Sequence, residues 1–418
     1  MYDWANSSYA LVITSTIFPT YYTHVAPEHI LFLGRTFGRA AFASYAISFS
    51  FLVIALLSPI LSSIADYKGN KKAFMKFFCY LGSLACVSLV FMDANHIIAG
   101  TLCSILASIG YCGSIVFYNA YLPEIADEQD QDRVSAKGFA LGYVGSVLLM
   151  LVCLAAIMCN DALHWGWGPW PVRLSFPAVG LWWAGFAQMT FRVLPPGRPS
   201  EQHPEHGILT NGFYELKKVW DQLVHYPTLK RYLRSFFFYN MGVQTVMYMA
   251  TYFASDELKL PDTALISSIL IIQLVAIGGA YLFSLLSART NNIFTLGCLI
   301  IVWVGICVFA FFTRTENQFF VLAFLVGLVM GGIQSMSRST YSKFLPETKD
   351  TASYFSFYDV CDKVGTVVGT LSFGFVAESM GGMRNSVLAL MGYFGIGFVL
   401  LLFVRTKPKN QPDAALHH

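Results

Sequence analysis

The sequence GLVMGGIQSMSRSTYSKFLPE, residues 327–347, closes an apolar stretch that begins near Phe319 and is long enough to cross a bilayer as a helix. At helical spacing, one stripe of this segment begins with small residues and then becomes polar: it contains Gly327, Gly331, Gln334, Arg338 and Tyr341. Small residues allow a neighbouring helix to approach closely. A guanidinium inside a membrane costs ~3 kcal/mol or more. We therefore expect Arg338 to face a watery cavity, to pair with an acid or to reach the membrane surface.

The composition is that of a membrane protein. Of 418 residues, 56% are hydrophobic and only 12% are charged, whereas soluble domains carry about 25% charged residues. The nine cysteines are scattered through apolar segments without a CxxC pair, so we interpret them as packing residues. Met1 directly precedes the YDWAN motif, which suggests a trimmed N-terminus, and the closing LHH resembles the remnant of a tag.

The hydropathy pattern predicts an all-α polytopic membrane protein with 12 transmembrane helices in two pseudo-symmetric six-helix bundles. Each predicted span is near the ~20 residues that cross a bilayer. The spans are 4–26, 41–63, 73–92, 97–121, 137–158, 174–194, 232–254, 263–286, 293–312, 319–341, 352–376 and 385–404. The long polar connection divides the chain into an N-terminal bundle (1–194), a cytoplasmic linker with an amphipathic helix (195–231), a C-terminal bundle (232–405) and a tail (406–418).

The distribution of basic residues predicts the orientation in the membrane. If the N-terminus is cytoplasmic, 20 of the 27 Lys and Arg residues lie in or near inside loops and six lie in outside loops, while Lys363 lies inside a span. Cytoplasmic loops carry an excess of basic residues. We therefore expect both termini to be cytoplasmic.

The two halves of the chain repeat one another. LPE occurs at 122–124 and again at 345–347, each time at the end of the fourth span of its half, and Gly142 and Gly365 keep the same offset of 223 residues. Duplicated helical units are typical of transporters, in which the solute binds near mid-membrane between the repeats.

The loop SSIADYKGNKK, residues 62–72, resembles the signature loop of the major facilitator superfamily. The matching positions are Asp66, Gly69, Lys71 and Lys72, and the departures are Ser62 and Tyr67. A carboxylate is favoured at the N-terminal end of a neighbouring helix, and the lysines are expected to meet the anionic inner leaflet. The resemblance implies that Asp66 and Lys71 control gating; the alternative is an ordinary positive-inside loop. The equivalent loop at 285–293 lacks the acid and keeps Arg289.

Five further motifs resemble those of the vacuole-effluxer branch of this superfamily. They are YDWANSSYA (2–10), FYNAYLPEI (117–125), FFYNMGVQT (237–245), GGIQSMSRSTYSKFLPE (331–347) and FSFYDVCDKVG (355–365). The resemblance implies a bacterial cell-membrane transporter that moves an amino acid or related metabolite by alternating access, coupled to protons. Many members have an acid where this chain has Met241, so a coupling role for that acid is not carried over.

Candidate solute-binding residues are polar side chains that share helical stripes or belong to these motifs. They are Asn6, Tyr118, Asn119, Asn240, Gln244, Gln334 and Tyr358. The competing interpretation is hydrogen bonding between helices, worth only ~0.6–2 kcal/mol per bond. Tyrosines near helix ends also form interfacial belts.

Charged residues within or beside the spans are candidates for ion coupling or gating. In addition to Asp66 and Lys71 they are Asp3, Glu124, Arg338, Asp359, Asp362 and Lys363. Asp3 is placed either to cap the first helix or to face a cavity. Lys363 follows Asp359 by one helical turn, and this order, with the acid first, favours an ion pair between them. Asp362 is then free to pair with Arg338, either as a structural network or as a protonatable site.

Two other functions are weighed against solute transport. A lipid or lysolipid transporter of the same fold would have a cavity that is apolar on one flank. A membrane-embedded enzyme would need converging acidic residues or histidines within spans, but His24, His96 and His164 are expected near the outer surface and no HExxH motif occurs. No P-loop occurs either. We expect a monomer in the lipid bilayer with a small-molecule solute, H+ as coupling ion, and neither catalytic residues, metal, cofactor nor nucleic acid.

Overall fold

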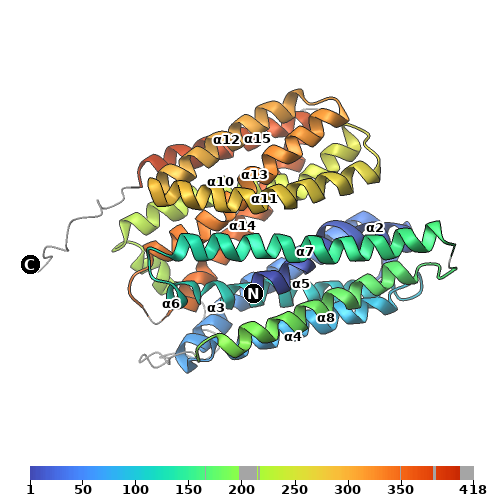
Figure 1. Ribbon diagram of the computed structural model, residues 1–418, viewed down its shortest axis with the longest axis horizontal. Coiled ribbons are helices and arrows are strands. Elements are labelled where there is room, and N and C mark those ends of the chain that lie inside the picture. Colours follow the sequence, from blue (N-terminus) through green and yellow to red (C-terminus); the bar gives the residue numbers. More distant parts are fainter. Residues whose placement is uncertain (165, 197–213, 215–216, 349, 380–382, 405–418) are drawn as a thin grey trace, which may run out of the picture.

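The computed structural model describes residues 1–164, 166–196, 214, 217–348, 350–379 and 383–404. The chain forms two helical bundles, which lie one above the other in Figure 1, with the blue-to-green first half below and the yellow-to-red second half above. The first bundle contains α1 (Tyr2–Ser8), η1 (Tyr9–Thr16), α2 (Ile17–Val25), α3 (Arg39–Lys68), α4 (Lys71–Ser88), η2 (Leu89–Phe91), α5 (Ile97–Asn119), α6 (Leu122–Ile125), α7 (Gln131–Ala162) and α8 (Trp170–Val193). The second contains α10 (Pro227–Asp256), α11 (Asp262–Arg289), α12 (Asn292–Phe312), α13 (Glu316–Phe344), α14 (Thr351–Ser379) and α15 (Met383–Leu402).

The predicted helical membrane fold is confirmed. Among the described residues, nine helices are long and apolar enough to cross a membrane: α3, α4, α5, α7, α11, α12, α13, α14 and α15 supply them. The predicted spans 174–194 and 232–254 also correspond to helices, α8 and α10. The number of twelve spans remains a prediction.

The first predicted span is not one regular helix. Its central turns, η1, form a π-helix between α1 and α2. The hydroxyls of Ser15 and Thr16 donate to the carbonyls of Ala10 and Leu11, five residues earlier, which is the spacing of a π-helix. Thr14 and Ser15 are exposed in the middle of the span. A uniform helical period would place Asp3, Asn6, Ala10 and Thr14 on one face, and the π-helical turns break that stripe.

A β-hairpin follows the first span, although the sequence predicted only a loop there. Strand β1 (His29–Phe32) pairs antiparallel with β2 (Arg35–Gly38). The two turn residues, Leu33 and Gly34, both have positive φ, 51° and 76°, as two-residue hairpin turns require. Leucine rarely adopts such a φ, so this turn carried no recognisable signal.

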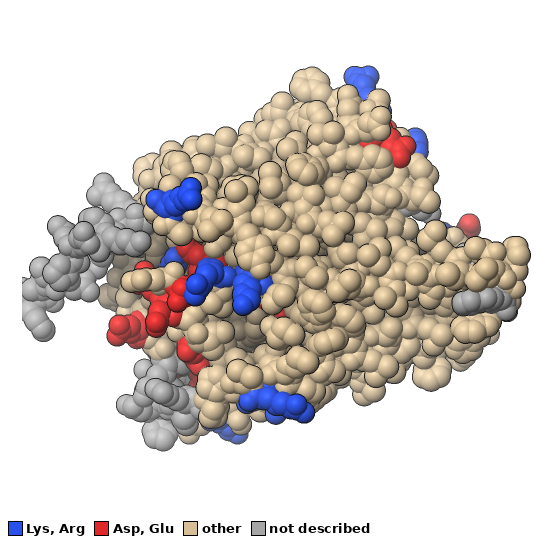
Figure 2. All heavy atoms as spheres, viewed as in Figure 1, with Lys and Arg blue, Asp and Glu red and all other residues tan. Residues whose placement is uncertain are grey.

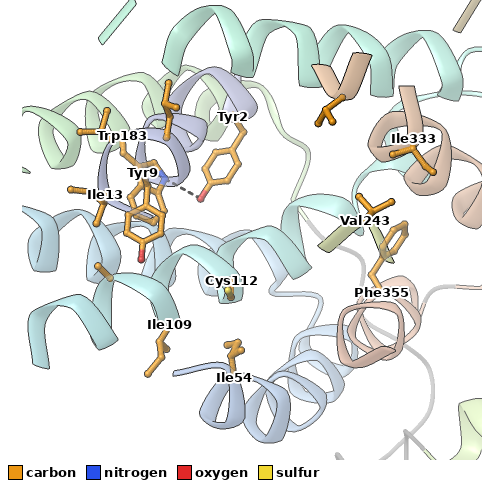
Figure 3. Packing of buried hydrophobic residues seen from close by; sticks show 14 of the residues in the cluster. Tyr2, Tyr9, Ile13, Ile54, Ile109, Cys112, Trp183, Val243, Ile333 and Phe355 are labelled. Carbon is orange, nitrogen blue, oxygen red and sulfur yellow. Dashed lines mark hydrogen bonds between the residues drawn. The ribbon is translucent and has the colours of Figure 1, made fainter. Parts of the chain in front are cut away.

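Aromatic packing ties the first span to the rest of its bundle. Figure 3 shows Tyr2, Tyr9 and Ile13 gathered around Trp183 of α8. The Trp183 indole is fully buried and donates to the Tyr2 hydroxyl at 3.4 Å. A Cβ on Gly82 of α4 would lie 2.4 Å from this indole, so the glycine makes room for it.

The sequence repeat is also a repeat of packing. A Cβ on Gly142 of α7 would meet Ser7 of α1 at 2.4 Å, and a Cβ on Gly365 of α14 would approach Phe237 of α10 at 3.5 Å. In each half, the fifth span therefore packs against the first at the repeated glycine.

The bundles meet through α7, which packs on α11 and α13, and through α14, which packs on α3 and α5. We call the end of the molecule where α6 lies and α15 ends, at the left in Figure 1, the terminus side. The hydrogen bonds between the bundles gather there and toward the middle, as those of Asp66 with Ser353 and of Lys343 with Asp132 illustrate.

The linker helix is only partly described. Residues 217–222 are helical, Val219 and Leu223 are buried, and the exposed Trp220 has its ring 6.2 Å from that of Phe357 on α14. The described part of the linker therefore packs on the second bundle.

The predicted close approach at the small residues of α13 is confirmed. A Cβ on Gly327 would lie 2.6 Å from the carbonyl oxygen of Ile272, and one on Gly331 would lie 2.2 Å from that of Ala276, both on α11. These glycines bring α13 into backbone contact with α11.

We predict that Gly331→Ala lowers the melting temperature of the purified protein, because overpacking a tight contact costs ~1–3 kcal/mol. The matched control is Gly305→Ala in α12, where nothing lies within 4 Å of the added carbon. Thermal unfolding in detergent measures both. Equal melting temperatures for the two variants would contradict the close packing of α11 and α13.

Candidate functional site

The first cluster of functional candidates joins the signature loop to the second bundle. The carboxylate of Asp66 accepts hydrogen bonds from the backbone N–H groups of Ala352 and Ser353 at 3.2 and 2.8 Å, and from the Ser353 hydroxyl at 2.8 Å. Since α14 begins at Thr351, Asp66 satisfies the first N–H groups of that helix. The expected position of this carboxylate, at the N-terminus of a neighbouring helix, is confirmed.

The turn after Asp66 depends on Gly69. This residue ends α3 in the left-handed conformation, with φ 63°, and its N–H bonds the carbonyl of Asp66 at 3.2 Å. Glycine adopts this conformation without the cost that a Cβ adds. The signature glycine thus orients the loop that carries the acid.

Lys71 completes this cluster, which we call the first latch (Asp66, Lys71, Glu124, Thr351 and Ser353). Its Nζ lies 3.7 Å from an Asp66 oxygen, bonds Glu124 directly and donates to the Thr351 hydroxyl at 2.6 Å. Lys71 is 2% exposed, so the expectation that it meets the lipid surface is wrong. Two carboxylates from its own bundle draw it inward, and Thr351 connects it to the other bundle.

The second cluster surrounds Arg338 of α13. Its guanidinium lies 3.5 Å from Asp3 of α1 and donates to the Ser135 hydroxyl and carbonyl of α7, both at 3.0 Å, and to Asn119 of α5 at 3.3 Å. Tyr118 donates to the other Asp3 oxygen at 2.5 Å. Arg338 is buried and therefore pairs with an acid, the second of the three alternatives set out for it.

The expected pairing of Arg338 with Asp362 is wrong. Arg338 points across the interface to the first bundle, where its Cζ lies 4.3 Å from the centre of the Phe139 ring. A Cβ on Gly138 would lie 2.3 Å from Asp3 and 3.0 Å from Arg338, so this glycine leaves room for the pair.

The third cluster, which we call the α14 cluster, contains Asp359, Asp362 and Lys363 of α14 and Asn240 and Gln244 of α10. Lys363 lies 3.4 Å from Asp359, as its spacing predicted, and 2.7 Å from Asp362. The other Asp362 oxygen accepts from Asn240 at 2.6 Å and from Gln244 at 3.0 Å. The second oxygen of Asp359 is buried without a hydrogen-bond partner among the described residues.

The remaining sequence candidates lie outside these three clusters. Gln334 accepts a hydrogen bond from Tyr143 of α7 at 2.7 Å and so joins the bundles near their middle. Asn6 is buried in α1. The ring of Tyr358 stacks on that of Phe236 at 4.3 Å and lies 4.7 Å from that of Tyr341.

A second latch was not foreseen. Asp132 of α7 bonds Lys343 of α13 at 2.7 Å, the Ser287 hydroxyl at 2.9 Å and the Asn292 amide at 2.8 Å. Ser287 and Asn292 flank the loop that lost its acid in the second half. Acids are common near the start of a helix because of the helix dipole alone. The position of Asp132 in the sequence therefore did not indicate that it pairs with Lys343.

The charged side chains gather where the latches lie. Figure 2 shows acidic and basic groups together at the left end of the molecule, where α6 lies and α7 begins in Figure 1. The two latches and the pair of Asp3 with Arg338 join the bundles by ion pairs and hydrogen bonds, whereas the α14 cluster lies within the second bundle. Among the described residues, no group of His, Cys, Asp and Glu is arranged to hold a metal ion.

Comparison with known proteins agrees with this architecture. The family model described as vacuole effluxer Atg22 like matches residues 1–414. The uncharacterized MFS-type transporter YxiO of Bacillus subtilis is 32% identical over 410 residues, covering 97% of this chain and 93% of its own length. Autophagy-related protein 22-2 of Neosartorya fischeri is 23% identical over 461 residues, covering 88% of this chain and 74% of its own length.

Solved structures show the same fold. The fucose:proton symporter FucP of E. coli matches with a TM-score of 0.70 at 14% identity, covering 97% of this chain and 96% of its own. At this identity the match shows the fold alone. The similar proteins are transporters and not enzymes, in agreement with the expectation from the sequence.

We predict that Asp3 and Arg338 are energetically coupled. Asp3→Asn or Arg338→Met alone is expected to destabilise the protein by roughly 3–5 kcal/mol, because each leaves a buried charge without its partner. The double variant is expected to lose much less than the sum. Thermal unfolding of the four proteins measures the coupling.

The exposed ion pair of Arg133 and Asp130, 3.1 Å apart, is the matched control. Its coupling is expected at about 0–1 kcal/mol. Purely additive losses for Asp3 and Arg338 would contradict the buried pair.

Proposed function

Because the chain belongs to the vacuole effluxer Atg22-like family of the major facilitator superfamily, we propose that it is a secondary transporter of a small polar solute, an amino acid or related metabolite, driven by protons. Membership of this family supports its assignment as a transporter. The solute class and the proton coupling are our proposals. The similarity to vacuole effluxers suggests the solute class, and the α14 cluster supports the proton coupling.

The unpartnered oxygen of Asp359 is the observation that supports proton coupling. Two carboxylates share one lysine in this cluster, so the three side chains carry a net negative charge when ionised. A buried carboxylate oxygen without a partner is costly. Binding a proton at Asp359 removes that cost, and releasing it restores the charge. Asp359 is therefore the proposed proton-carrying residue, with Lys363 and Asp362 as its electrostatic partners.

The amide groups of α10 support solute binding at the same cluster. Asn240 and Gln244 both donate to Asp362, on a different helix of the same bundle. Amides that bridge two helices can exchange these bonds for bonds to a solute. Tyr118, Asn119, Gln334, Asn6 and Tyr358 are proposed to extend the polar surface toward the first bundle.

The closed terminus side supports alternating access. Both latches and the pair of Asp3 with Arg338 join the bundles there, whereas Thr14 and Ser15 of the first span and Thr251 of α10 are exposed. We propose that the terminus side is cytoplasmic and closed in this state. Opening it requires Asp66, Lys71, Glu124, Asp3 and Arg338 to separate from their partners.

The proposed division of the chain follows the bundles, with units at 1–194 and 232–405 joined by the linker at 195–231. We also propose that the protein works as a monomer in the bacterial inner membrane. The two latches and the pair of Asp3 with Arg338 each join the two bundles of a single chain, so one chain supplies a complete interface between bundles.

Transport of an amphipathic lipid is the second candidate, because the second bundle contains an apolar cavity. The clusters of buried charge at the interface favour a polar solute, since an acyl chain offers no partner for them. The two candidates are distinguished by whether an amino acid or a lipid drives proton movement.

We predict that an amino acid added to proteoliposomes drives proton movement through the wild-type protein. The vesicles contain a pH indicator, and the standard amino acids are added one at a time across a pH gradient. Asp359→Asn is expected to abolish proton movement while still exchanging labelled solute, because the neutral side chain no longer binds and releases a proton.

Asp130→Asn, which changes an exposed acid, is the control and is expected to behave as wild type. If no labelled amino acid is taken up, the solute class is wrong. If solute moves without protons in the wild type and Asp359→Asn has no effect, the coupling proposal is wrong.

A further inference from the structure

A cavity lies within the second bundle, on the half that is remote from the terminus side. Helices α10 to α15 line it. Ser15 of η1 is the lining residue from the first bundle, so the cavity borders the interface between bundles. Met247 and Thr251, which lie on α10 beyond Gln244, belong to its wall. The cavity is therefore separate from the α14 cluster in its lining residues.

The lining excludes a charged ligand. Among the described residues that line the cavity there is no Asp, Glu, Lys, Arg or His, and most are aliphatic, aromatic or sulfur-containing, as Val326, Ile306 and Phe373 illustrate. An ion in such surroundings would lack compensation for its lost hydration. A hydrocarbon body is instead favoured in proportion to the apolar area that it buries.

Gln273 of α11 is the polar feature that points to a ligand. Gln273 is one of the residues that line the cavity, and its Oε1 is buried without a hydrogen-bond partner among the described residues. A buried amide oxygen without a donor costs ~1–3 kcal/mol. The two serine hydroxyls of the lining already donate to carbonyls of their own helices, Ser268 to Ala264 at 2.8 Å and Ser15 to Ala10 at 2.9 Å. Neither serine is therefore the donor for Gln273 Oε1, and a hydroxyl group of a molecule bound in the cavity can supply it.

We propose that this cavity binds an uncharged amphipathic molecule with a hydrocarbon body and a hydroxyl group that donates to Gln273 Oε1. The hydrocarbon occupies the apolar wall formed by α10, α13 and α15, and the hydroxyl satisfies the buried amide. This site does not depend on the proposed transport function, because it is defined by residues outside the latches and the α14 cluster. Membrane diacylglycerol and a free medium-chain alcohol share the required chemistry.

Photolabelling of the full-length protein tests the site without any transport measurement. The protein in phosphatidylcholine vesicles is irradiated with a medium-chain alkanol that carries an aliphatic diazirine, and labelled peptides are mapped by mass spectrometry. Labelling is expected at lining residues such as Met247, Val326 and Phe373. Labelling confined to outward-facing positions such as Leu274 and Leu285, which are 54% and 64% exposed, would overturn the proposal.

The variant Gln273→Leu tests the role of the amide. It is expected to reduce labelling of the cavity by the alkanol about fivefold, the effect of losing one hydrogen bond worth ~1 kcal/mol. A hydrocarbon diazirine without the hydroxyl should label wild type and variant equally. Gln188→Leu is the matched control, because this amide of α8 bonds the carbonyl of Ala184 at 2.6 Å, far from the cavity lining. Equal alkanol labelling of wild type and Gln273→Leu would overturn the proposed bond.

Competition distinguishes the two sources of the ligand. Protection by dioleoylglycerol in the vesicles would support a membrane lipid, and protection by free decanol alone would support a small alcohol. Absence of protection by both would overturn the site. Ala323→Phe, which fills the cavity wall, is expected to abolish labelling. If that variant fails to fold, Gln273→Leu and its hydrocarbon control still decide the outcome.

Discussion

The cost of placing charges inside a membrane constrains the rest of this structure. Arg338 is buried, and it is tolerated because Asp3, Asn119 and Ser135 of the other bundle surround it. Removing any buried charge from its partner is expensive. The bundles therefore close together at the residues where their charges meet. In the proposed alternating-access cycle, opening this side would exchange these contacts for contacts with water, solute or protons, so the same residues would carry the charge and control the opening.

The two latches lie on the same side of the molecule, but different residues form them. In the first, the acid Asp66 lies in the last turn of α3 and caps α14 of the other bundle. In the second, the acid Asp132 lies in the first turn of α7, and Asn292, the first residue of α12, offers its amide. Both contacts link the bundles on the terminus side, while the negative charge lies at the end of α3 in one and at the start of α7 in the other. Loss of the acid from the second signature loop did not remove the link between the bundles.

Several features could be predicted because they depend on local pattern. The apolar spans, the repeated LPE, the close approach at Gly331 and the ion pair of Asp359 with Lys363 all follow from spacing along one chain segment. The errors concern partners in other segments. Lys71 was expected at the lipid surface but is drawn between two carboxylates, and Arg338 was assigned to Asp362 but bonds the first bundle. The π-helix of the first span escaped notice because a uniform helical period was assumed.

By itself, the sequence determined that this protein is a duplicated helical membrane protein of a transporter family, since hydropathy, basic loops and motifs are local properties of the chain. Only the tertiary structure decided which acidic side chain pairs with which basic side chain. Spacing within a helix sets the depth and the face of a side chain, but several acids lie at similar depth on neighbouring helices. The choice among them depends on how close two backbones come, as Gly138 shows by leaving the space in which Asp3 and Arg338 meet.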